Sequence, residues 1–243
     1  MIFITGDVHG MKDAGKFDTP YFRDVINKPG NTIIITGDFG VTWTMEALEH
    51  AREYYSQFDC QFLFIDGNNE NFDILNSLPV SEYAGGKVHE VSSNIKHLMR
   101  GEIFTIEGTT ILAFGGADSW DAPDVNTFTR RVEGVSWWKA EKPTDAEFRN
   151  AMDNIRAHGG KVDIILSHET TTKNVQNYFS WSITSTTCQM LDAIEANTEY
   201  KQWFFGHHHY DYIIDNSQRC LFNDFVDVSH MEDIPYVENQ NME

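Results

Sequence analysis

Short runs of apolar residues, each followed at once by glycine and then by polar side chains, recur along the chain. The first three are Met1–Thr5, Thr32–Thr36 and Gln61–Asp66, and each has the length of a buried strand rather than of a helix. Between the last two, apolar residues at helical spacing predict an amphipathic helix over Met45–Phe58. Strands joined by helical crossovers predict an α/β fold built on a parallel sheet.

The rest of the chain continues this pattern with shorter elements. Thr144 and Glu147 form a capping box ahead of an apolar stripe, and Gly159 lies just past its end, which predicts a helix between them. The turn Glu107–Thr109 predicts a hairpin. The other predicted elements are a helical piece at Tyr21–Ile26, a helix at Cys188–Ala196, and strands at Ile95–Met99, Ile103–Ile106, Thr110–Phe114, Val162–Leu166, Gln202–Phe205, Tyr212–Asp215 and Arg219–Phe222.

In one long segment the apolar residues show neither helical nor strand spacing. Residues Ala117–Lys139 are rich in Asp, Arg and Trp and are predicted to form a loop, and long loops in compact domains are commonly functional. There is no internal repeat, low-complexity tract or evident linker. We therefore expect a single domain over residues 1–243.

The net charge of the chain restricts the classes of ligand that it is expected to bind. The chain of 243 residues carries a formal net charge of -19, which argues against binding of long nucleic acid or of an anionic membrane. A small phosphorylated ligand stays open, because bound metal ions can reverse the local sign. No apolar run approaches the roughly 18 residues of a membrane span, and no secretion signal is evident. Cys60, Cys188 and Cys220 form no CxxC motif and are expected to be buried thiols of a cytoplasmic protein.

Five predicted strands end in polar clusters that carry metal-ligand chemistry. In chain order the clusters read GDVHG, GDFG, GNNE, SH and GHHH. Each alone is an ordinary strand-end turn, but the carboxyl ends of strands in an open sheet meet at one edge, where ligands bind. Carboxylate, amide and imidazole groups gathered there suit a divalent metal ion. Five such clusters together predict a metal site.

These clusters resemble the signature of the calcineurin-like metallophosphoesterase superfamily. That signature runs D-x-H, then G-D, then G-N-H followed by Asp or Glu, then a lone His after a strand, then G-H-x-H, and this chain matches its order and spacing over nearly its whole length. The segment from Gly115 to Pro143, with Ser136-Trp137-Trp138, is similar to bacterial and phage members of this size. The resemblance implies a four-layer α/β/β/α sandwich of two mixed sheets flanked by helices, in the cytoplasm of a bacterium or of a phage-infected cell.

The resemblance also implies a dinuclear metal centre that hydrolyses a phosphate ester through metal-activated water. Its second GHxH histidine favours a phosphodiester, such as a cyclic nucleotide or dinucleotide, over a monoester, with a phosphoprotein as a further alternative. Mn²⁺ is the expected ion, with Fe, Zn²⁺ or Ni²⁺ as alternatives. The implied ligands are Asp7, His9 and His209 for one ion, Asn68, His168 and His207 for the other, and Asp38 as the bridge.

The chain departs from the signature at Asn69, where the family has the histidine that assists the leaving group. An amide donates a hydrogen bond but cannot transfer a proton near neutral pH. Three interpretations remain open: a natural variant with a good leaving group or another acid, a substitution engineered to trap substrate, and a catalytically inactive protein that sequesters a phosphorylated ligand. The intact flanking loop favours a weakened or engineered but active scaffold, with Glu70 orienting the loop.

Other side chains have open roles. His208 is expected to point away from the metals, because side chains alternate along an extended chain. In the long loop, arginines could meet a phosphate, aspartates could support the metal ligands, and tryptophans could stack a nucleobase or simply pack. These candidates are Arg130, Arg131, Asp118, Asp121, Trp120, Trp137, Trp138 and, beyond the loop, Trp181. The unassigned histidines His50, His89, His97, His158 and His230 are expected to be structural or exposed. The expected partner is a small phosphorylated molecule such as a nucleotide; the oligomeric state is not predicted.

Overall fold

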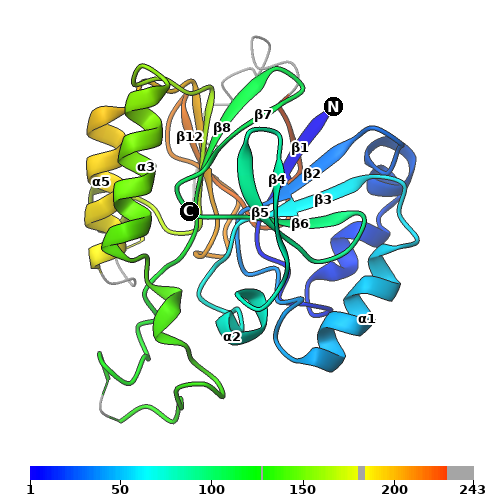
Figure 1. Ribbon diagram of the computed structural model, residues 1–243, viewed down its shortest axis with the longest axis horizontal. Helices are drawn as coiled ribbons and strands as arrows, with labels where there is room; N and C mark the ends of the chain where they lie inside the picture. The colour runs from blue at the N-terminus through cyan, green and yellow to red at the C-terminus, as the bar shows by residue number, and fades with distance from the viewer. Residues whose placement is uncertain (127, 180–183, 229–243) are drawn as a thin grey trace, which may run out of the picture.

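Two mixed β-sheets packed face to face form the centre of the structure, a computed structural model that describes residues 1–126, 128–179 and 184–228 (Figure 1). The first sheet runs in the order β13 (Val226–Asp227), β1 (Ile2–Thr5), β2 (Thr32–Ile35), β3 (Gln61–Phe64), β6 (Ile95–Leu98), β5 (Gly86–Glu90) and β4 (Val80–Tyr83). The second runs in the order β11 (Tyr212–Ile213), β12 (Gln218–Cys220), β10 (Gln202–Phe205), β9 (Ile164–Ser167), β8 (Thr109–Phe114) and β7 (Ile103–Ile106). The parallel strands β1, β2, β3 and β6, and β8, β9, β10 and β12, make the interior of each sheet.

Helices cover the outer face of each sheet, so the fold is the expected α/β/β/α sandwich. The helices are α1 (Met45–Tyr55), α2 (Phe72–Leu75), α3 (Asp145–Ala157), α4 (Thr172–Tyr178) and α5 (Thr186–Asn197), with short helices η1 (Ala14–Asp18), η2 (Phe22–Ile26) and η3 (Lys139–Glu141). In Figure 1, α3 and α5 flank one sheet and α1 flanks the other. None of the helices within the described ranges is long and apolar enough to cross a bilayer.

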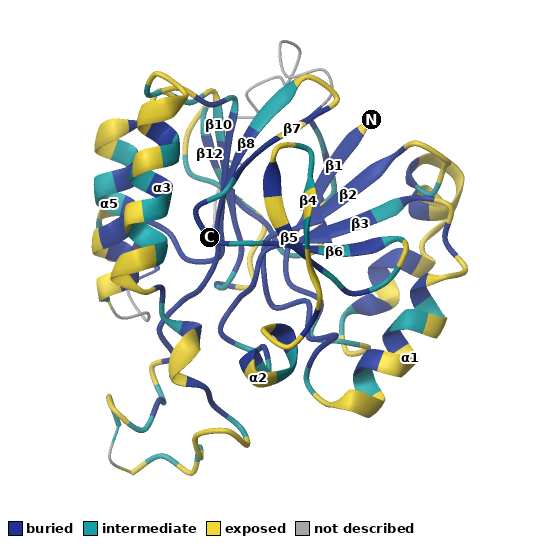
Figure 2. Cartoon of the chain, in the orientation of Figure 1, coloured by how far each residue is buried: buried dark blue, intermediate teal, exposed yellow. Residues whose placement is uncertain are grey.

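The alternation of side chains along β1 shows how the layers are filled. Phe3 points outward and joins the cluster that contains Leu48 and Tyr55 of α1, whereas Ile2 and Ile4 point between the two sheets. A third cluster packs the second sheet against α3 and α5. The central strands of the sheets are buried on both faces, whereas the edge strand β4 and one side of each helix are partly exposed, as the colours of Figure 2 show. This burial explains the uninterrupted apolar runs in the sequence.

The predicted helices are confirmed with shifted ends. Thr144 and Glu147 make the expected capping box of α3. Helix α1 begins after Thr44, whose side chain accepts a hydrogen bond from the backbone N–H of Ala47, but it ends at Tyr55 rather than at Phe58. The prediction that Met45 belongs to its apolar stripe is wrong, because this side chain is 57% exposed.

The sequence analysis missed the hairpin of β4 and β5, the short helices α2 and α4, and strand β13. It also assigned Thr109 to a turn, although this residue begins β8. The turn of the β4–β5 hairpin is formed by Ala84 and Gly85, which both have positive φ. An alanine in the left-handed conformation is uncommon, so this turn lacks the Asn-Gly or Asp-Gly pattern by which such hairpins are found.

A buried ionic network links β5 and β6 of the first sheet to Asp66 after β3. Nε of Arg100 donates to Oδ2 of Asp66 at 2.8 Å, and Nε2 of His97 lies 3.0 Å from Oδ1 of the same carboxylate. Nδ1 of His97 in turn contacts Nδ1 of His89 at 2.9 Å. Burial alone would raise the pKa of Asp66, but Arg100 and His97 outweigh it and hold this pKa well below its usual value.

Replacing Arg100 with methionine should destabilise the protein strongly, because Asp66 would stay buried without its main partner. Loss of one member of a buried pair costs about 3–5 kcal/mol. Urea unfolding followed by circular dichroism measures the change. The matched control is Arg23→Met, whose partner Asp18 is exposed and whose loss should cost at most about 1 kcal/mol. Equal effects of the two variants would contradict the role assigned to the network.

Candidate metal centre

The loops that follow five strands of the two sheets meet at one place. The predicted single edge is in fact two edges, because β1, β2 and β3 belong to the first sheet and β9 and β10 to the second. The loops contribute Asp7 and His9 after β1, Asp38 after β2, Asn68 after β3, His168 after β9, and His207 and His209 after β10. Thus the structure brings together side chains from both ends of the chain.

The first group of side chains is compact. One potential ligand atom from each of Asp7, His9, Asp38 and His209 lies within 4.8 Å of the others. Nε2 of His209 is 3.2 Å from Oδ2 of Asp7, and Nε2 of His9 is 3.3 Å from Oδ2 of Asp38. These residues are the ones that the sequence analysis assigned to one ion and to the bridge.

The second group of potential ligands lies near Oδ1, the other carboxylate oxygen of Asp38. Nε2 of His168 lies 3.4 Å from Oδ1 of Asp38 and 3.2 Å from Oδ1 of Asn68. The ring of His207 is next to that of His168, with 5.0 Å between centroids, but its Nε2 faces the carboxylate of Glu169 at 3.5 Å. His207 is therefore adjacent to this group rather than in direct contact with Asp38. The two oxygens of Asp38 each face a different group.

Hydrogen bonds outside the centre orient two of its imidazoles. Nδ1 of His168 donates to the backbone carbonyl of Thr36 at 2.7 Å, and Nδ1 of His9 pairs with Oδ2 of Asp13 at 2.8 Å. In both rings Nε2 is left facing the cluster. Such outer partners fix the tautomer and the direction of metal-binding histidines.

The charges at the centre favour cations. Burial lowers the pKa of His168, but the charges of Asp38 and Asp7 outweigh it and raise this pKa to about 10. Burial is likewise outweighed at His9, where Asp38 and Asp7 raise the pKa to about 9. Asp38 is the counterpart: despite its burial, the neighbouring histidines hold its pKa well below the usual value. Two buried carboxylates thus create a site that is most stable with positive charge beside it.

One atom in particular fits a bound cation. Oδ2 of Asp7 is buried and accepts no hydrogen bond from the described residues, although His209 lies close to it. A buried carboxylate oxygen without a partner is costly. A divalent ion would satisfy it, and the oxygen and nitrogen donors around it suit Mn²⁺, Fe or Zn²⁺. The residues present therefore fit a metal ion.

The backbone at the centre is strained and closely packed. His9, Asp38, His207 and His209 all have positive φ, between 49° and 67°, which is uncommon for residues other than glycine and clusters at functional sites. A Cβ on Gly206 would lie 2.2 Å from Oδ1 of Asp7. Gly206 is therefore required by the close approach of Asp7.

Comparison with known protein families identifies the family of this chain. The model of the calcineurin-like phosphoesterases matches residues 1–211. The chain belongs to this family. Calcineurin-like phosphoesterases hydrolyse phosphate esters with the help of divalent metal ions, typically two. No functionally curated protein matches the chain.

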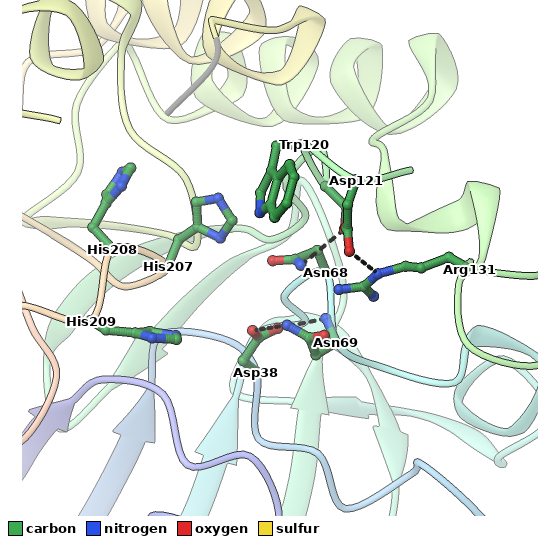
Figure 3. Close-up of a pocket in the computed structure, with 10 residues that line it drawn as sticks. Asp38, Asn68, Asn69, Trp120, Asp121, Arg131, His207, His208 and His209 are labelled. Atoms are coloured by element: carbon green, nitrogen blue, oxygen red, sulfur yellow. Dashed lines mark hydrogen bonds and ion pairs between the residues drawn. The ribbon is translucent and has the colours of Figure 1, made fainter. Parts of the chain in front are cut away.

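Asn69, the departure from the phosphoesterase signature, is bonded to the central carboxylate. Its backbone N–H donates to Oδ1 of Asp38 at 2.7 Å and its side-chain Nδ2 donates to Oδ2 at 2.6 Å (Figure 3). The neighbouring Glu70 is fully buried and accepts hydrogen bonds from the N–H of Gly40 at 3.1 Å and the hydroxyl of Thr42 at 2.9 Å. Glu70 thus joins the loops after β2 and β3, which agrees with the orienting role expected for it.

Several supporting residues were not anticipated. Lys16 is buried and donates to the backbone carbonyl of Asp7 at 2.8 Å, so it helps to fix the position of the loop after β1. Glu169 contacts His207 and also pairs with Nε2 of His208 at 2.9 Å. Ser119 accepts a hydrogen bond from Nδ2 of Asn68 at 3.1 Å. Glu169 directly follows the predicted ligand His168. This acidic residue beside a predicted ligand was a sequence signal from which the supporting role of Glu169 could have been inferred.

A cavity of about 560 Å³ opens over the phosphoesterase centre and is walled by the long loop. Trp120, 67% exposed, lines it together with Asp121 and Arg131, which form an ion pair at 2.8 Å (Figure 3). His208 also lines it, but its ring points away from Asp38, as expected, and stacks on Phe179.

The other candidates lie apart from this cavity. Trp137 and Trp138 are buried, and Asp118 accepts a hydrogen bond from Thr187 at 2.5 Å, so these three have packing roles. Arg130 is exposed and does not line the cavity. His50 and His158 are exposed and His89 and His97 are buried in the ionic network, as expected. Trp181 and His230 lie outside the described residues.

The packing of the phosphoesterase centre makes a sharp prediction for Gly206→Ala. The added Cβ must displace Asp7, so metal affinity should fall at least about tenfold and stability by about 1–3 kcal/mol. Titration calorimetry with Mn²⁺ measures the affinity. Gly15→Ala is the matched control, because nothing lies within 4 Å of its Cβ position. Unchanged Mn²⁺ affinity in Gly206→Ala would contradict the placement of Asp7 as a ligand.

Proposed function

We propose that the protein is a dinuclear-metal-dependent phosphoesterase that hydrolyses a small phosphodiester. The observation that carries the proposal is the position of Asp38, whose two carboxylate oxygens face two separate groups of potential ligands. Asp7, His9 and His209 would hold one ion and Asn68, His168 and His207 the other, with Asp38 between them. To hold an ion, His207 would give up its contact with Glu169.

Hydrolysis of a phosphodiester forms a bond between a water oxygen and phosphorus and breaks the bond to one ester oxygen. That oxygen leaves as an alcohol and takes up a proton, and the other product is a phosphomonoester. Two divalent ions, with Mn²⁺ as the expected metal, supply positive charge for the phosphate oxygens and make the attacking water more acidic. The protein contributes the orientation of the centre and the cavity that holds the substrate.

The walls of the 560 Å³ cavity support a nucleotide-like substrate. Its volume lies in the usual range for small-molecule sites. Trp120 offers an exposed ring for stacking a base, and Arg131 offers a guanidinium for a second phosphate, at the expense of its pair with Asp121. The net charge of -19 disfavours long nucleic acid as the substrate.

A second function is favoured by the contacts of Asn69. Its amide nitrogen donates a hydrogen bond to Asp38 but cannot transfer a proton to a leaving group near neutral pH. A centre that holds metals and phosphate but turns over very slowly would sequester a phosphorylated ligand rather than destroy it. The two functions differ in turnover, not in metal content.

Replacing Asn69 with histidine separates them. We expect the Mn²⁺-loaded protein to hydrolyse bis-p-nitrophenyl phosphate, whose good leaving group needs little acid assistance. We expect Asn69→His to hydrolyse esters with poor leaving groups, such as cyclic nucleotides, faster by up to about 10²–10⁴-fold, because a general acid is restored. Release of p-nitrophenol measures the rate, and a panel of cyclic nucleotides and dinucleotides extends the assay to natural esters.

Asp38→Asn is the control for both proteins, because it removes the central charge and should abolish turnover and Mn²⁺ binding together. Metal-loaded protein and Asn69→His that are both inactive on every ester would rule out the enzyme in favour of the sequestering protein. Retention of Mn²⁺ affinity by Asp38→Asn would contradict the metal centre itself.

A further inference from the structure

A second cavity lies on the other side of Asn69. Its volume is about 360 Å³, and it is formed where the loop after β1 meets the start of α1. His9 and Asn69, both at the metal centre, belong to its lining, and Asn69 lines the 560 Å³ cavity as well. The two cavities therefore flank one residue that is bonded directly to Asp38.

The two cavities differ in chemistry. The larger one is lined by Trp120, by the ion pair of Asp121 and Arg131 and by polar ligands of the centre, so it offers charged and polar groups beside one ring. The side chains that the smaller one adds beyond the centre are Met11, Trp43 and Ala47, all apolar. Burying an apolar group against such side chains is favourable, at about 25 cal/mol for each Å² removed from water.

The wall of the smaller cavity is preformed rather than loose. The ring of Trp43 packs edge to face on that of Trp138, with 5.5 Å between centroids. Its backbone carbonyl accepts a hydrogen bond from Nδ2 of Asn71 at 3.2 Å, and Nε1 of Trp138 donates to Oδ2 of Asp73 at 2.8 Å. Asn71 and Asp73, which hold these two tryptophans in place, follow Asn69 closely in the chain. The segment after β3 that contacts Asp38 thus also supports the wall of this cavity.

We propose that the smaller cavity binds one of the two organic groups of a phosphodiester substrate, and that this group is aromatic or otherwise apolar. The other organic group then lies in the larger cavity, with the phosphate between them at the metal centre. A phosphomonoester has one organic group and leaves one cavity empty. This proposal rests on the proposed phosphoesterase function and specifies its substrate as an asymmetric diester with one polar and one apolar arm.

Filling the smaller cavity tests the proposal. Ala47→Phe places a ring in it from helix α1, which carries none of the proposed metal ligands. We expect the ratio of kcat/KM for bis-p-nitrophenyl phosphate to kcat/KM for glycerol 2-phosphate, a monoester whose organic group is polar, to fall by about tenfold or more, the size of effect that lost pocket contacts produce. The control is Met45→Phe, which adds a ring to the same helix at an exposed residue outside the cavity lining and should leave the ratio unchanged.

A second variant covers the case in which Ala47→Phe does not fold. Met11→Ala removes apolar atoms from a side chain that is 48% exposed and should lower the same ratio about threefold to tenfold. For each variant, calorimetric affinities for the two esters with Mn²⁺ bound give a readout that does not require turnover.

The outcomes separate the two proposals. If the wild-type protein turns over neither ester, the enzymatic function fails, while the affinity ratio still tests the cavity. If Ala47→Phe or Met11→Ala folds and leaves both ratios at the value of Met45→Phe, or weakens both esters equally, the smaller cavity is not a substrate site and the proposal is overturned.

Discussion

The buried carboxylate of Asp38 is the group on which the rest of the site depends. Its backbone carbonyl accepts hydrogen bonds from the N–H groups of Val8 at 3.1 Å and His9 at 2.8 Å, which hold the loop after β1. Its side chain accepts two hydrogen bonds from Asn69 after β3 and contacts His168 after β9. One residue therefore connects the two sheets at their common end. Removing its charge would disturb the positions of three loops as well as the electrostatics.

This dependence explains why the strand-end motifs are short and rich in glycine. A Cβ on Gly67 would lie 2.0 Å from Oδ1 of Asp38, and one on Gly37 would lie 2.2 Å from Nδ1 of His168. The charged and imidazole groups can approach one another only where the adjoining residues have no side chain. The same closeness leaves two carboxylates buried side by side, a repulsive arrangement that neighbouring imidazoles or metal ions must offset.

The sequence predicted most of this architecture because its signals are local. Apolar runs of strand length followed by glycine mark β1, β2 and β3, and the capping box marks α3. The rest depends on contacts between distant segments, which no local pattern encodes. Lys16 supports Asp7 only because η1 folds back behind the first loop, and the division of strands between two sheets emerges only from their pairing. The roles of Trp120 and Trp138 likewise could not be separated, because both lie in the segment without helical or strand periodicity, although one is exposed and the other buried.

The long loop after β8 contributes to both cavities at once. Trp120 and Arg131 stand at the larger cavity, while Trp138 braces Trp43 at the smaller one. Between these anchors the loop is largely exposed and carries few of the side chains that make up the core. Changes in its length or composition can therefore reshape both cavities together without altering the sheets. In evolutionary terms, the shape of the two cavities can change through one insertion rather than through many coordinated substitutions.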